Sequence, residues 1–494
     1  MTASTPPSTA LDRAAGTGPD APPLRIAVVG HTNVGKTSLL RTLTRRVDFG
    51  EVSDRPGTTR HVEQVDLRID GTPVVRFHDT PGLEDAVTLL AHVSQLPGDS
   101  RPARIRAFLQ GPEAQAAFEQ EAKVLRLLLD ADAAFLVIDT REPVLPKYRD
   151  EVELLGACAR PVLPILNFIA HGASREPQWR AMLSDAGLHA VVRFDAAAPF
   201  TGAERDLYHD LGTLLPARRE ALRAVAAHLL AEAAARHAGA CHSVAGTLVS
   251  CAALQRVVPT AQLADPQRRA AEVEALRATL QEEVRGNTAA LLRLYGFRPG
   301  DAAESPLPQL EGLEGMDLFN PELLRQAGLR LGQGAAVGAV LGAAADLAVG
   351  GLSLGAGALL GGTLGGALAQ GLGPLGRRLA GRLRGQQALT VEDTVLYVLA
   401  ERQLALVRAL EARGHGAVGT AAVDTATAAL SPERSDALRA AVQATRVARA
   451  HPEWRPTGAR RAVVSSARDE AVDRVAAHLV QAAGRVANGP PTLF

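Results

Sequence analysis

The residues best suited to chemistry lie near the N-terminus, in the segment 24–40, which reads LRIAVVGHTNVGKTSLL. A short apolar run ends in Gly30, and Lys36 and Thr37 follow it, ahead of an apolar pair that a helix can bury. This is the pattern G-x-x-x-x-G-K-[ST] between a strand and a helix, which is typical of loops that bind phosphate groups. The segment therefore predicts a site for a nucleoside phosphate.

Each residue type in this loop has a physical reason. Gly30 and Gly35 allow a tight backbone whose N–H groups point at one phosphate chain, and the positive end of the next helix strengthens that field. Lys36 would reach the terminal phosphates, and the Thr37 hydroxyl would be a ligand of the magnesium ion that bridges them. The loop residues predicted to contact the nucleotide are Gly30, Asn33, Val34, Gly35, Lys36, Thr37 and Ser38.

Two later segments complete the predicted phosphate site. The stretch 50–61 reads GEVSDRPGTTRH, and we choose Thr59 over its neighbour Thr58 as the hydroxyl that binds magnesium when a third phosphate is present. A strand-like run then ends in Asp79-Thr80-Pro81-Gly82, where the carboxylate can hold magnesium through water and the Gly82 N–H can sense the terminal phosphate. The predicted catalytic residues are Lys36, Thr59 and Gly82, and the predicted magnesium ligands are Thr37, Thr59 and Asp79.

The elements that position these segments alternate between strand and helix. An Asp70-Gly71 turn predicts a hairpin between the runs 61–69 and 73–78. The polar stretch 96–120 predicts an insertion beside the second switch, the segment that begins at Asp79-Thr80-Pro81-Gly82. The alternation predicts an α/β fold, a mainly parallel sheet with helices on both faces. The remaining strands are expected at 26–29, 133–138, 161–166 and 190–194.

The three motifs GHTNVGKTS, PGTTR and DTPG resemble those of the translation-factor-like GTPases of the TrmE–Era kind. The resemblance implies a Ras-like P-loop domain that binds GTP or GDP with magnesium and hydrolyses GTP. Leu83 stands where ordinary Ras-like enzymes carry a catalytic glutamine, as in the class with a hydrophobic residue there. Asn33 matches an asparagine that coordinates potassium in some of these relatives, or it stabilises the loop. Glu84 and Asp85 either orient the attacking water or begin a solvated helix.

The expected base site departs from the family pattern. The sequence has Asn167-Phe168-Ile169-Ala170 where the resemblance implies Asn-Lys-x-Asp. Phe168 can stack on a base, but the methyl group of Ala170 cannot accept hydrogen bonds from guanine. Asp195, after the last strand, either replaces this acceptor or caps the next helix. The predicted base contacts are therefore Asn167, Phe168 and Asp195.

From Thr201 on, apolar residues recur every three or four positions, which predicts an all-α region without a catalytic constellation. The expected helices span 204–237, 264–295, 389–413, 433–449 and 467–486.

A Gly-rich stretch at 331–376 interrupts these helices, and Asp346 is its only charge. Glycines at every fourth position, such as Gly357, Gly361 and Gly365, allow close helix contact in a bilayer. Arginines on both flanks predict a hairpin with both ends in the cytoplasm. The stretch either associates with a membrane or packs inside a helical bundle.

Composition limits the remaining choices. The net charge is zero over 494 residues, so no global basic field indicates nucleic acid. Three scattered cysteines and the lack of a signal-like N-terminus suit the cytoplasm, with the inner membrane as a second location. The expected domains are a disordered tail (1–22), a Ras-like domain (23–205), a helical region (206–325), the Gly-rich hairpin (326–386) and a second helical region (387–494).

The whole arrangement resembles bacterial GTPases whose C-terminal half is a domain of unknown function. Two functions follow as hypotheses: a GTP-hydrolysing switch at the inner face of a membrane, or a soluble nucleotide-gated module in ribosome or RNA maturation. The expected partners are guanine nucleotide, membrane lipid through the hairpin, an unknown effector protein and a second copy of the chain.

Overall fold

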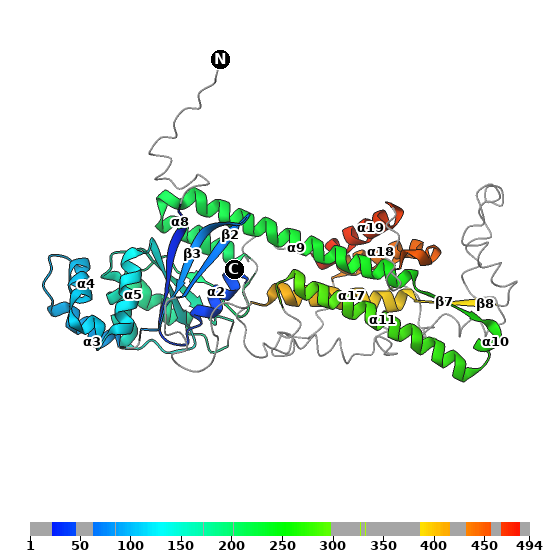
Figure 1. Cartoon of the computed structure of the whole chain (residues 1–494), viewed down its shortest axis with the longest axis horizontal. Helices are drawn as coiled ribbons and strands as arrows, with labels where there is room; N and C mark the ends of the chain where they lie inside the picture. Colours follow the sequence, from blue (N-terminus) through cyan, green and yellow to red (C-terminus); the bar gives the residue numbers. More distant parts are fainter. Residues whose placement is uncertain are drawn as a thin grey trace, which may run out of the picture. The chain divides into compact units, whose positions relative to one another are not determined.

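In the computed structural model the chain divides into two compact units (Figure 1). The first comprises Met1–Ala234, Glu411–Ala421 and Val486–Phe494, and the second comprises Ala235–Leu410 and Ala422–Arg485. Thr58, Thr59, Glu84 and most of the Gly-rich stretch lie outside the described residues. The residues that the structure describes are 22–45, 63–83, 85–170, 172–200, 202–297, 327, 331, 386–414, 431–455 and 466–484.

A six-stranded sheet in the order β2-β3-β1-β4-β5-β6 forms the centre of the first unit. Only β2 and β3 pair antiparallel, and all other neighbours are parallel. The predicted mainly parallel sheet is thus confirmed, although its last strand is shorter than expected. The strands are β1 (Leu24–Val29), β2 (Glu63–Ile69), β3 (Thr72–Asp79), β4 (Ala133–Asp139), β5 (Val162–Asn167) and β6 (Val192–Arg193).

Helices cover both faces of this sheet because the central strands are apolar on both sides. In β1, Ile26 and Val28 belong to one core, while Ala27 and Val29 belong to the other. The first core is closed by α2 (Lys36–Thr44), α8 (Ala203–Leu214) and the start of α9 (Arg219–Ala253). The second is closed by α3 (Ala86–Gln95), α4 (Arg101–Gln110), the short η1 (Pro112–Gln115), α5 (Glu119–Asp130), α6 (Pro146–Gly156) and α7 (Glu176–Asp185).

Local sequence signals account for several of these boundaries. Asp70 and Gly71 both have positive φ, 49° and 80°, as a two-residue hairpin turn requires. The Asp85 side chain accepts the Thr88 N–H and caps α3, which favours the helix-start interpretation of this residue. The single helix expected at 204–237 is wrong: α8 ends before Pro216, which lacks an N–H, and η2 (Pro216–Arg218) precedes α9.

The second unit is largely helical, as predicted, and has one extended core. The prediction missed the antiparallel pair β7–β8, because the two strands are far apart in sequence and no hairpin signal joins them. Inside the core, Asn287 donates to Gln403 (2.9 Å) and accepts from Ser243 (2.6 Å). Its elements, besides the rest of α9, are β7 (Gln255–Pro259), α10 (Thr260–Leu263), α11 (Pro266–Leu294), β8 (Gln386–Thr390), α17 (Asp393–Ala412), α18 (Pro432–Ala444), η3 (Thr445–Ala450), η4 (Pro452–Trp454) and α19 (Ser466–Ala483).

Within the ranges that the structure describes, no helix combines the length and the apolar character needed to cross a bilayer. Most of the Gly-rich stretch is not among those residues.

Candidate nucleotide-binding site

The polar residues of the site stand at the carboxyl ends of neighbouring parallel strands. Gly30 follows β1, Asp79 ends β3, and Asp139 and Asn167 end β4 and β5. The register pairs Val28 with Asp79 and Asp139 with Asn167, so these ends lie along one edge of the sheet. Ligands of open α/β sheets bind at this edge, where the strand order reverses.

The phosphate loop from Gly30 to Gly35 is packed so tightly that its glycines cannot be replaced. Gly30 and Gly35 have φ values of 138° and 91°, a region that favours glycine. A Cβ at Gly30 would lie 2.5 Å from the Val137 carbonyl oxygen, and one at Gly35 would lie 2.4 Å from Asn167 Nδ2. The predicted role of these glycines therefore has a steric basis here.

Lys36 begins α2 directly after this loop and is buried, with 7% of its surface exposed. Its Nζ donates to the carbonyl oxygens of His31 (2.8 Å) and Gly30 (3.1 Å). Burial lowers the pKa of Lys36 to about 8, against the opposing attraction of Asp79 and Glu151. The ammonium group of Lys36 is thus desolvated, and the opposite charge of a bound polyphosphate would stabilise it.

Thr37 and Asp79 have the chemistry of a magnesium site. The Thr37 hydroxyl donates to Asp79 Oδ2 at 2.5 Å. Burial raises the pKa of Asp79 to about 6, although the Thr37 hydrogen bond and the charge of Lys36 oppose this. Among the described residues, Asp79 Oδ1 is buried without a hydrogen-bond partner. An orphaned carboxylate oxygen beside a threonine hydroxyl fits a hydrated magnesium ion.

The DTPG segment approaches the phosphate loop directly. A Cβ at Gly82 would lie 2.5 Å from Thr32 Cγ2 and 2.7 Å from Thr32 N, so only glycine fits. Leu83 is fully buried in the core beside α3, so its side chain is turned away from solvent. Its carbonyl oxygen accepts a hydrogen bond from His31 Nδ1 (2.9 Å). The side chain of the phosphate-loop residue His31 therefore ties that loop to the residue that follows the DTPG segment.

His31 is one site residue that sequence reasoning missed. Its Nδ1 also lies 3.0 Å from Glu151 Oε1, and its Nε2 lies 2.9 Å from Lys147 Nζ. The two charged residues come from α6, far along the chain, so no local pattern could have marked the cluster.

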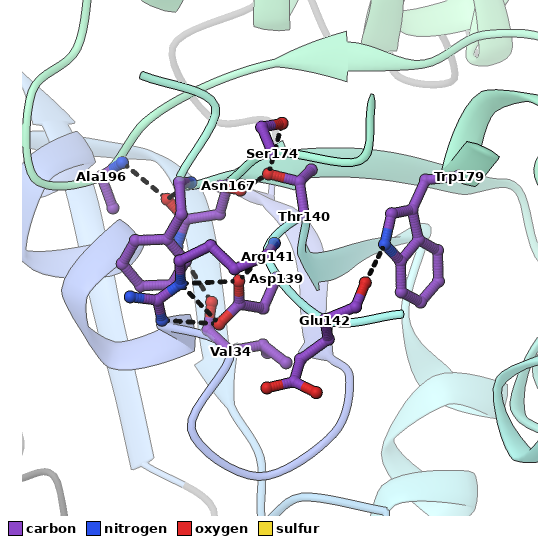
Figure 2. A network of polar contacts seen from close by, with 10 residues as sticks. Val34, Asp139, Thr140, Arg141, Glu142, Asn167, Ser174, Trp179 and Ala196 are labelled. Atoms are coloured by element: carbon purple, nitrogen blue, oxygen red, sulfur yellow. Dashed lines mark hydrogen bonds and ion pairs between the residues drawn. The ribbon is translucent and has the colours of Figure 1, made fainter. Parts of the chain in front are cut away.

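Asn167 joins three loops of the site. Its Nδ2 donates to the Val34 carbonyl (2.9 Å), and its Oδ1 accepts the N–H groups of Phe168 (3.0 Å) and Ala196 (2.9 Å). Figure 2 shows the bond from Ala196 to Asn167. The side chain is 1% exposed and positions the phosphate loop relative to the loops that follow β5 and β6.

Asp195 caps its own loop and reaches the segment that follows Asn167. Its Oδ1 accepts the N–H groups of Ala197 (3.1 Å) and Ala198 (3.3 Å), and its Oδ2 accepts the Ala170 N–H (3.3 Å). The carboxylate therefore lies next to the position where the family pattern has an aspartate. These bonds resemble a loop cap, and the contact of Asp195 with a base stays a prediction.

Arg141 is a second residue that the sequence did not single out. Its guanidinium carbon lies 3.8 Å from the centre of the Phe168 ring. Its Nε and Nη2 also bind the Asp139 carboxylate, the closest approach being 2.6 Å (Figure 2). These hydrogen bonds and the Asp139 charge raise the pKa of Arg141, so the group stays a cation.

The predicted residues that the structure describes gather at this edge of the sheet. The phosphate loop meets Asp79 and Gly82 on one side and Asn167 on the other. Asn33 is exposed and has a positive φ of 62°. Ser38 lies in the first turn of α2.

Comparisons with known proteins match two parts of the chain, and the second match begins within the first compact unit. Residues 25–168 match a family model described as "50S ribosome-binding GTPase". A GTP-binding protein EngB from Anaeromyxobacter dehalogenans (strain 2CP-C) is 32% identical over 140 residues, 25% of this chain and 62% of that protein. A tRNA modification GTPase MnmE from Chelativorans sp. is 48% identical over 62 residues, 13% of this chain and 14% of that protein.

Among solved structures, Era from Aquifex aeolicus bound to GDP and AlF4⁻ matches 35% of this chain and 50% of its own, with 21% identity and a TM-score of 0.26. The matches to EngB and MnmE thus cover less than two thirds of those proteins. Residues 180–477, more than half of this chain, match the model of a domain of unknown function, DUF3482. The chain therefore belongs to the DUF3482 family, and its N-terminal part carries a domain that matches the GTPase model.

Proposed function

We propose that the protein is a GTP-hydrolysing switch that acts at the cytoplasmic face of a membrane through its helical C-terminal half. The observation that carries the switch is the contact between the phosphate loop and the DTPG segment, formed by Asp79, Gly82 and His31. A terminal phosphate bound to Lys36 would compete with these contacts and move the second segment. Thr59 is proposed to close the site from the other switch.

The chemistry assigned to the chain is electrostatic. Lys36 and the loop N–H groups would stabilise charge that develops on the terminal phosphate. Thr37, Thr59 and Asp79 would hold magnesium, which neutralises the phosphate oxygens when bound. Because the Leu83 side chain is buried, it does not orient the attacking water, and we propose that potassium held by Asn33 assists the step instead.

Phosphate release from GTP tests the activity. We expect turnover by the full chain with magnesium, with Lys36→Ala and Thr37→Ala reducing it at least 100-fold. Turnover should be faster in potassium than in sodium, and Asn33→Ala should remove that difference while nucleotide binding persists. Equal turnover by wild type and Lys36→Ala would contradict the assignment of this site.

The membrane role rests on the Gly-rich stretch 331–376 and its flanking arginines. In a flotation assay with anionic vesicles, we expect the full chain to float with the lipid. Leu360→Asp should reduce flotation, since a charge inside the hydrocarbon core costs up to about 3 kcal/mol. GTP turnover by this variant should match wild type. A chain that stays at the bottom of the gradient would contradict the membrane role.

The description of the matched GTPase family favours a second candidate, a nucleotide-gated module in ribosome maturation. Under this alternative, the GTP-loaded chain would sediment with ribosomal subunits and release them on hydrolysis. Sedimentation with and without vesicles separates the two roles in one experiment.

A further inference from the structure

The loop that carries Arg141 is fixed by contacts on each side of the residue. The Thr140 hydroxyl donates to the Asn167 carbonyl (2.8 Å) and accepts from Ser174 (3.0 Å). The indole of Trp179 donates to the Glu142 carbonyl (3.0 Å), as Figure 2 also shows. Arg141 therefore extends from a rigid support at the end of β4, next to the end of β5 at Asn167.

The orientation of the guanidinium group is fixed by Asp139. Asp139, which is 6% exposed, accepts from both the Arg141 backbone N–H (2.9 Å) and the guanidinium. Such a bidentate pair fixes the orientation of the planar group as well as its position. The guanidinium carbon lies over the Phe168 ring, 3.8 Å from its centre, which is the separation of a cation–π contact.

Phe168 is also held in place, at a backbone conformation that side chains rarely adopt. Its φ is 58°, and its N–H is bound by Asn167 Oδ1. Non-glycine residues in this region are uncommon and persist only where their surroundings require them. The half-buried ring is therefore directed by Asn167 and covered by Arg141.

The groups that normally read a guanine edge are missing or engaged at the same place. Ala170 offers no acceptor, and its N–H is bound to Asp195. The Ala196, Ala197 and Ala198 N–H groups, which follow β6, are bound to the side chains of Asn167 and Asp195. These N–H groups already have partners within the protein, so they are engaged at the place where the edge of a base would be read.

We propose that Arg141 and Phe168, anchored by Asp139, form a platform on which a purine base stacks, and that this stack replaces the edge contacts that read guanine. This inference rests on the proposed nucleotide site and assigns its base selectivity. Stacking tolerates changes at the base edge because every base has a π face. GDP, IDP and XDP, whose bases carry an amino group, a hydrogen and an oxo group at C2, should therefore bind within about tenfold of one another.

The test is competition of these three diphosphates and of inorganic tripolyphosphate against a ribose-labelled fluorescent GDP, with magnesium, on the full chain. Phe168→Ala and Arg141→Ala should weaken all three nucleotides by about 5- to 100-fold and leave tripolyphosphate unchanged. Phe168→Trp should retain affinity, while Arg141→Lys should not, because lysine lacks the planar group. Asp139→Asn should weaken binding in the same pattern as Arg141→Ala.

A gain of selectivity provides the converse test. The double variant Phe168→Lys, Ala170→Asp restores the family pattern and should favour GDP over XDP by more than 100-fold. The platform is wrong if the wild type already separates GDP from XDP by that factor, or if Arg141→Ala leaves every affinity unchanged. If the wild type binds neither nucleotide nor tripolyphosphate, the proposed function itself fails.

Discussion

At the scale of one residue, Asp79 places a carboxylate charge in a buried position, which is unfavourable for the folded chain. The carboxylate is 1% exposed, and burial raises its pKa to about 6 from the ordinary 3.8. The folded chain binds the proton of Asp79 more tightly than the unfolded chain does. The contribution of this protonation to the free energy of unfolding is therefore complete below about pH 4 and is lost as the pH rises through about 6. At neutral pH the charge is a cost that magnesium would offset.

Asp79→Asn should therefore raise the free energy of unfolding of the nucleotide-free chain at pH 7.5, by roughly 1–3 kcal/mol. The amide keeps an acceptor for Thr37 but removes the buried charge. The same variant should lose the magnesium-dependent part of nucleotide affinity. Urea denaturation at pH 5 and pH 7.5 measures the effect, which should shrink at the lower pH.

Asp66 is the matched control, because its hydrogen bond to Arg76 lowers its pKa. Its contribution is present above the unfolded pKa and is lost as the pH falls, so Asp66→Asn should destabilise the chain at pH 7.5. If Asp79→Asn also destabilised the chain at pH 7.5, the buried charge of Asp79 would not lower the free energy of unfolding as described.

Asn167 makes a second prediction at this scale. Asn167→Ala leaves the Val34 carbonyl and the N–H groups of Phe168 and Ala196 without their partner, which should cost about 2–4 kcal/mol and at least tenfold in nucleotide affinity. Asn167→Asp keeps the two acceptor bonds and should fall between wild type and alanine. Denaturation and fluorescent-GDP titration of the three proteins measure both effects. Equal GDP affinities in the three proteins would refute the role of Asn167 in positioning the loops of the site.

At the scale of the element, the loop 195–198 is held by contacts with residues that lie far from it in the sequence. Gly414, just beyond α17, donates its N–H to the Ala197 carbonyl (2.9 Å), and Thr42 of α2 donates to the Ala196 carbonyl (2.8 Å). A Cβ at Gly414 would lie only 1.9 Å from the Ala196 oxygen. The loop 195–198 and Gly414, which contacts it, both lie within the DUF3482 match.

Gly414→Ala should displace this loop, destabilise the first unit by about 2 kcal/mol and weaken GDP binding. Gly156→Ala is the control, since a Cβ there meets nothing within 4 Å. The comparison is made by thermal melting with and without GDP. Equal melting temperatures and affinities for the two variants would show that the loop does not depend on Gly414.

The elements also show which features a sequence can predict. The phosphate loop, the hairpin at Asp70-Gly71 and the helical character of the second unit depend on local patterns, and the structure has them. The sequence did not predict that Arg141 and His31 belong to the site, because their partners, Phe168 and Glu151, are brought near only by the sheet and α6. The β7–β8 pair was not predicted either, because its two strands are far apart in the sequence.

At the scale of the whole molecule, the two units should unfold with separate responses to nucleotide. The three cysteines are buried: Cys158 in the first unit, Cys241 and Cys251 in the second. Burial raises the pKa of Cys158 to about 12 and also raises that of Cys251, so neither thiol should react in the folded chain at pH 8.

Thiol labelling along a urea gradient tests this prediction. A saturating nucleotide, at about 100 times its Kd, should protect the first unit by about 3 kcal/mol and shift labelling of Cys158 to higher urea. Labelling of Cys241 and Cys251 reports the second unit and serves as the internal control. Rapid labelling of the native chain, or a nucleotide shift at Cys251 without one at Cys158, would contradict the placement of the site.

The central claim is that the loop around Lys36 binds a nucleoside phosphate, and calorimetric titration of the full chain with magnesium and GDP tests it most directly. We predict one saturable site per chain and a loss of at least 100-fold in affinity for Lys36→Ala, about 3 kcal/mol of binding free energy. Equal affinity in wild type and Lys36→Ala, or no binding by the wild type, would contradict the account.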